Sequence, residues 1–84
     1  MDGRYDELLL IAGLAIRDDR VRNRRPGRVE EKLAFRLAYH VLSNGLDPYE
    51  ALIALRESNL IDDGLDMMLF EECYWRYIDL LRGR

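Results

Sequence analysis

The chain has 84 residues, of which 49% are hydrophobic, and a formal net charge of −3. A chain of this length forms one domain, residues 1–84, and buries only about 60–65% of its unfolded surface, so its stability depends on close packing or association. The single cysteine, Cys73, excludes an internal disulfide and favours a reducing, cytoplasmic setting. The apolar run Leu8–Ile16 follows acidic residues and is far shorter than a membrane span, so we expect neither a secretory signal nor a membrane partner.

The first predicted element is a helix over residues 5–22 that is apolar on two sides. At 100° per residue, one stripe contains Tyr5, Leu8, Leu9, Ile11, Ala12, Ala15 and Ile16, and a second stripe on nearly the opposite side contains Leu10, Leu14 and Val21.

The end of this helix and the following loop form the most unusual segment of the sequence. Residues 17–28 read R-D-D-R-V-R-N-R-R-P-G-R and carry a net charge of +4, whereas the rest of the chain carries −7. Arginine matches planar carboxylate and phosphate groups through bidentate hydrogen bonds, so this segment indicates an anionic partner. The candidate binding residues are Arg20, Arg22, Arg24, Arg25 and Arg28.

Two further helices are predicted over residues 29–44 and 48–60. Glu30 and Glu31 suit the positive end of the helix dipole, and Gly45 is typical of a left-handed C-terminal stop. In the next segment, Asp47 is a candidate N-cap, Pro48 occupies the first helical position, and Glu50 completes a capping box.

A fourth helix is predicted over residues 65–81, after the break at Asp62-Asp63-Gly64. Its apolar arc is broad and marks the expected core face. Trp75 and Met68 lie off that arc, seven residues apart, among charged side chains.

No segment alternates apolar and polar residues as a strand does. The short connections predict an all-α fold, a compact four-helix up-down bundle or its orthogonal variant, with no sheet. The expected core contains Leu9, Ile16, Leu33, Leu37, Val41, Leu52, Leu55, Leu69, Phe70, Cys73 and Tyr77.

Two helices with apolar residues on both sides exceed what one small core covers. We therefore expect a second buried surface, either in a homodimer or against a partner protein, formed by the Leu10/Leu14 stripe or the Trp75/Met68 stripe. The alternative is burial within the chain, with Trp75 against a loop and the two leucines against the third helix.

The sequence offers little support for enzyme chemistry, and we expect no catalytic residue, metal site or cofactor. His40 is the single histidine and lies at the edge of an apolar arc, and Cys73 lies within one, which is typical of an inert buried thiol. The acidic pairs Asp62-Asp63 and Glu71-Glu72, with Asp66, lack the spacing of an EF-hand.

Nucleic acid is the alternative partner, because the five candidate arginines could neutralise several phosphates in a small transcriptional regulator. Against it, the pI is about 5.1 and residues 45–84 carry a net charge of −5. The third helix, with one arginine and two glutamates, makes a poor recognition helix.

The sequence therefore favours a non-enzymatic protein-binding module, a small helical adaptor or inhibitor. Immunity proteins and phage-encoded anti-defence proteins are often of this size and composition, which is an analogy of class alone. Twelve arginines against one lysine indicate a GC-rich bacterial or phage genome.

Overall fold

Helix α2, Arg28–Ser43, is the central element of the fold, and α1, α3 and α4 all pack on it. The computed structural model describes residues 3–22, 28–58 and 65–83, without the side chains of Arg4, residues 18–22 and Arg28. In these residues the predicted all-α bundle is confirmed, with four α-helices and no strand.

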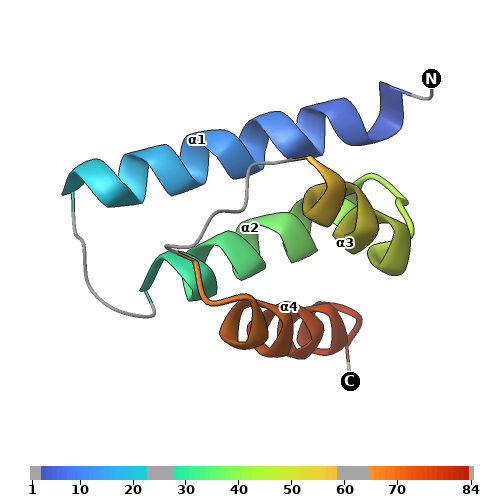
Figure 1. Ribbon diagram of the computed structural model, residues 1–84. Coiled ribbons are helices and arrows are strands. Elements are labelled where there is room, and N and C mark those ends of the chain that lie inside the picture. The colour runs from blue at the N-terminus through green and yellow to red at the C-terminus, as the bar shows by residue number, and fades with distance from the viewer. Residues whose placement is uncertain (1–2, 23–27, 59–64, 84) are drawn as a thin grey trace.

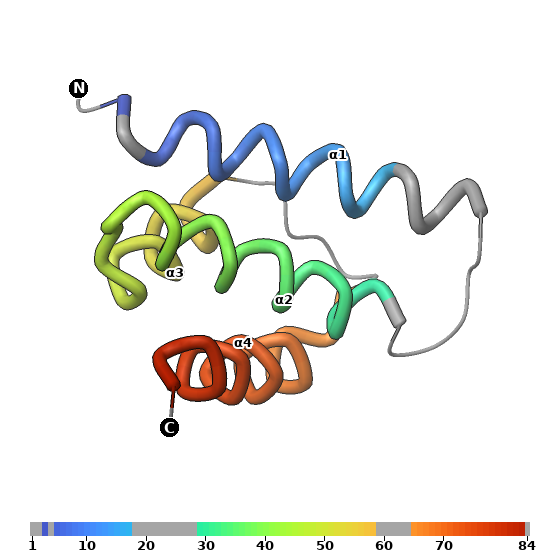
Figure 2. Tube along the Cα trace, turned by 180° about the vertical axis from the view of Figure 1, so that it is seen from behind, coloured from blue at the N-terminus to red at the C-terminus, as the bar shows by residue number. Residues whose placement is uncertain are grey.

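The helices form a flat body with principal extents of 33 × 31 × 19 Å. After a 3-10 turn at Gly3–Tyr5, α1 (Asp6–Arg22) runs antiparallel to α2 along one edge of the molecule, as Figures 1 and 2 show. Helix α4 (Met67–Leu81) crosses the other side of α2 steeply, and α3 (Pro48–Glu57) lies beside the C-terminal end of α2. The arrangement is the orthogonal variant of the bundle.

The predicted helix boundaries agree with the structure to within three residues. The largest difference is at the end of α3, which is Glu57 and not residue 60. The backbone N–H of Ser58 donates to the Leu55 carbonyl at 3.3 Å, and its hydroxyl donates to the same oxygen at 2.6 Å, which closes the last turn. Residues 59 and 60 lie outside the described part of the chain.

Local capping explains where the later helices begin and where α2 ends. Gly45 has φ 66°, a left-handed conformation that L side chains rarely adopt, and Leu46 N–H then donates back to the Val41 carbonyl at 2.9 Å. Asp47 Oδ1 accepts hydrogen bonds from the backbone N–H groups of Tyr49 and Glu50 at 2.8 and 3.1 Å, which confirms the predicted N-cap.

The core lies between the inner faces of the four helices. Predicted core residues Ile16, Leu33, Leu37, Val41, Leu52, Leu55, Phe70 and Cys73 are buried. The core prediction was wrong for Leu9, Leu69 and Tyr77, which lie half-buried at the edge of the core. Leu8 and Tyr74 occupy the interior, at 0% and 1% exposure, because α1 and α4 are each rotated slightly from the predicted orientation.

Three tyrosine hydroxyls link separate elements around this core. Tyr74 donates to the Pro48 carbonyl at 2.7 Å, Tyr77 to Glu31 Oε1 at 3.1 Å, and Tyr5 to Glu50 Oε2 at 3.1 Å. The Glu50 carboxylate of the predicted capping box thus accepts a hydrogen bond from the N-terminal segment.

We expect Tyr74→Phe to lower the free energy of unfolding at pH 7 by about 1 kcal/mol, because the Pro48 carbonyl loses its donor. Burial raises the pKa of Tyr74 above its ordinary value of 10.0. Because the pKa of Tyr74 is higher in the folded state than in the unfolded state, its hydroxyl contributes fully to stability at pH values below the unfolded-state pKa. That contribution is lost as the pH rises through the folded-state pKa. Wild-type stability therefore falls above about pH 10, and falls less in the variant.

Urea unfolding followed by circular dichroism at pH 7, 9 and 11 measures both effects. Tyr39→Phe, which removes the hydroxyl of an exposed ring, is the matched control at pH 7. Equal stability of the Tyr74 variant and the wild type at pH 7 would contradict the structural role of this bond.

Candidate functional site

The predicted arginine cluster spans the connection between α1 and α2. Arg20 and Arg22 belong to the last turns of α1, and Arg28 is the first residue of α2, but their side chains are outside the description. Arg24 and Arg25 lie wholly outside the described residues. The predicted convergence of these five side chains on one partner therefore stays a prediction.

The predicted Leu10/Leu14 stripe is on the surface. Leu10 is 62% exposed and Leu14 is 54% exposed, and both line a groove of about 600 Å³. Its other lining residues are Asp6, Leu9, Gly13 and Arg17 of α1, and Ser58 at the end of α3. Because more than half of each leucine is open to solvent, the third helix does not bury this stripe.

The predicted Trp75/Met68 stripe is also exposed, on the outer face of α4. Met68 is 83% exposed and Trp75 is 36% exposed. The indole ring meets the Tyr74 ring edge to face, with 5.2 Å between centroids, so a buried neighbour on its own helix fixes its position. The alternative of complete burial against a loop is not what the structure has.

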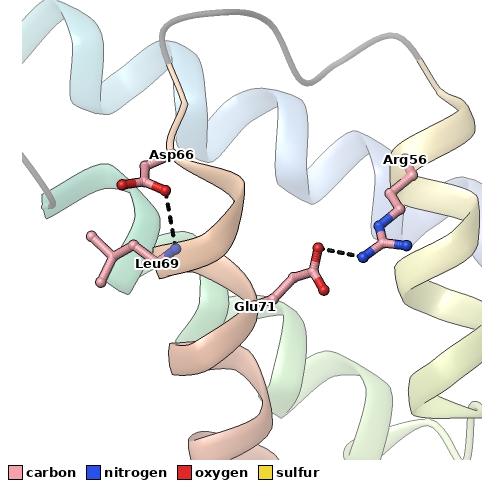
Figure 3. A network of polar contacts seen from close by, with 4 residues as sticks. All are labelled: Arg56, Asp66, Leu69 and Glu71. Atoms are coloured by element: carbon pink, nitrogen blue, oxygen red, sulfur yellow. Dashed lines mark hydrogen bonds and ion pairs between the residues drawn. The ribbon is translucent and has the colours of Figure 1, made fainter.

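An ion pair between α3 and α4 lies beside this stripe. Arg56 Nη2 donates to Glu71 Oε2, and this hydrogen bond raises the pKa of Arg56, as Figure 3 shows for the two side chains. Glu71 lies three residues after Met68 and four before Trp75, so all three share one side of α4. Together with Arg56, these three residues form the α4 surface.

The start of α4 is fixed next to this surface. Asp66 Oδ1 accepts a hydrogen bond from Leu69 N–H at 3.1 Å, which caps the helix (Figure 3). The Asp66 backbone N–H donates to Glu30 Oε2 of α2 at 2.8 Å. The outer residues of α4 are therefore carried by a helix that is anchored at its first turn.

Sequence reasoning missed a third exposed apolar surface on α2. The Phe35 ring stacks on Tyr39 at 6.4 Å and meets Tyr77 of α4 edge to face at 5.2 Å. A groove of about 380 Å³ follows the two α2 aromatics, and Ile11 of α1 also lines it. The signal was present, since Phe35 and Tyr39 are four residues apart on the side of α2 opposite to Leu37 and Val41.

Two side chains with reactive groups, Cys73 and His40, lie in the described part of the chain. Cys73 is a free thiol buried in the core, and the Asn44 side-chain amide lies 3.3 Å from His40 Nδ1 and donates to the His40 carbonyl at 2.9 Å. Among the described residues, no three His, Cys, Asp or Glu side chains gather as a metal site. Asp62 and Asp63, which the sequence pairs with Glu71-Glu72 and Asp66, fall outside that part.

None of the described helices combines the length and the hydrophobicity that a transmembrane span requires. Comparisons with protein families, curated proteins and solved structures found no significant match to this chain.

Trp75 is the single tryptophan of the chain, so its fluorescence reports on the α4 surface alone. We expect iodide to quench the native emission partially, because about a third of the side chain is exposed, and to quench it more strongly in urea. Native quenching equal to that of the unfolded chain, or none at all, would contradict the packing of the indole on Tyr74.

Proposed function

We propose that this protein is a non-enzymatic protein-binding module, a small helical adaptor or inhibitor, and that a partner protein docks on the α4 surface. The observation that carries this proposal is the exposed Trp75/Met68 stripe beside the Arg56–Glu71 ion pair. The buried, unpaired Cys73 supports a reducing cytoplasm as its setting.

The composition of the α4 surface supports a protein partner. Tryptophan, methionine and arginine are enriched in the centres of protein interfaces, where a large side chain fills a pocket of the partner. The Trp75 ring is already oriented by Tyr74, so docking orders few additional rotamers. Arg56 and Glu71 present both signs of charge beside it, which gives a partner electrostatic complementarity at the rim.

Trp75→Glu should abolish capture of the specific partner, because it places a charge at the centre of the docking surface. The measurement compares tagged wild-type and variant protein as baits in an extract of the source organism, or of its host for a phage gene. Leu80→Glu is the matched control, since it introduces the same charge at a leucine of the same helix that is 57% exposed.

The captured protein is then purified and titrated against the wild type, with Trp75 emission as the readout. A blue shift of the emission and saturable binding support the proposal. A partner that binds the Trp75 variant as tightly as it binds the wild type would overturn it.

The arginine segment gives a second test, which separates protein from nucleic acid. If the five arginines dock carboxylates of a protein, Arg24→Glu or Arg25→Glu should weaken that complex and slow its association, and duplex DNA should bind weakly near 150 mM salt. If they bind phosphates, DNA affinity should fall with salt at a log–log slope of about −0.9 per phosphate contacted. Tight duplex binding at physiological salt would instead favour gene regulation.

A further inference from the structure

Helix α1 presents an outward face with the spacing of a helix-packing seam. Asp6, Leu10, Gly13 and Arg17 line the groove at intervals of four, three and four residues, with Leu9 and Leu14 on either side of them. Figures 1 and 2 show α1 along one edge of the molecule. The end of α3 reaches the groove at Ser58, but Leu10 and Leu14 remain 62% and 54% exposed. A second helix therefore has access to this face.

The six groove residues of α1 pair with one another under a two-fold operation. If a second α1 lies antiparallel, with the axis between residues 11 and 12, Leu9 meets the second copy's Leu14 and Leu10 meets its Gly13. The same operation places Asp6 opposite Arg17. Every residue that α1 contributes to the groove thus finds a partner within the same set.

The charges select this orientation. Asp6 and Arg17 are both exposed and stand at opposite ends of the seam, about 16 Å apart along the axis. An antiparallel copy brings opposite charges together twice, once at each end, whereas a parallel copy would place each charge against its own equal. Gly13 carries no side chain, so a leucine of the second copy can pack directly on the backbone.

We propose that the chain forms an antiparallel homodimer through this face of α1, with Leu10 and Leu14 at its centre and Asp6 paired to Arg17 of the second copy. The homodimer is separate from the proposed docking of a partner protein, because it leaves the α4 surface free for that partner. The dimer buries the two leucines that the single chain leaves more than half exposed.

Light scattering and sedimentation equilibrium on the full chain test the dimer from about 5 to 500 μM. The wild type should approach twice its mass of 9.9 kDa. Leu14→Glu should weaken association by about a hundredfold, because it buries a charge at the centre of the interface. Leu80→Glu adds the same charge at a similarly exposed leucine of α4 and should leave the dimer unchanged.

The charge pairs are tested by mixing two variants. Asp6→Arg alone and Arg17→Asp alone should each weaken self-association roughly tenfold, because both end contacts become like-charged. An equimolar mixture of the two should recover a heterodimer of near wild-type affinity, since each end then has opposite charges again. Recovery on mixing also excludes misfolding as the cause of the single-variant losses, and circular dichroism checks each variant.

A wild type that remains a single chain at 500 μM would overturn the proposal. A dimer that survives Leu14→Glu but is lost in Trp75→Glu would overturn it too, since the second copy would then occupy the α4 surface. Unchanged affinity in Asp6→Arg would refute the antiparallel pairing. If Leu14→Glu yields single chains that still bind the captured partner, self-association and partner docking are separate properties.

Discussion

The packing of α4 across α2 is the interaction on which the rest of the structure depends. Helix α4 packs along α2, and two side-chain links, Tyr74 to Pro48 and Arg56 to Glu71, join it to α3. Phe70, Tyr74 and Ile78 are fully buried, and burial of such side chains contributes about 1.5–3 kcal/mol each. Because α1 covers another side of α2, the remaining outward side carries Phe35 and Tyr39 into solvent.

A buried carboxylate sets the point at which this packing begins. Glu30 is 4% exposed, and its Oε2 accepts the Asp66 N–H, which holds the first turn of α4 against the first turn of α2. Its Oε1 has no hydrogen-bond partner among the described residues. Burial of a carboxylate costs several kcal/mol unless it is compensated. The apolar contacts further along α4 must offset that cost. In return, the hydrogen bond between Glu30 and Asp66 specifies one register between α2 and α4.

The features that local chemistry determines could be predicted from the sequence. The left-handed Gly45 and the Asp47-Pro48 start depend on neighbouring residues alone, and the exposed positions of Leu10, Leu14, Trp75 and Met68 follow from helical periodicity. The exact inward face could not be predicted, because it depends on how two helices cross. Residues on the arc are equivalent in a wheel diagram, whereas the crossing angle decides that Leu8 and Tyr74 enter the core while Leu9 and Tyr77 remain at its edge.

The same dependence explains why the Phe35 surface was missed and what it has in common with the other two surfaces. The spacing places Phe35 and Tyr39 opposite to Leu37 and Val41, but the positions of α1 and α4 decide that this side of α2 stays open. Leu10, Leu14, Met68 and Tyr39 are each more than half exposed, so they contribute little hydrophobic free energy to folding. Substitutions at these positions therefore have little cost to the fold. Because α1 and α4 lie on opposite sides of α2, a molecule bound to the α4 surface would not by itself block the groove at Leu10 and Leu14.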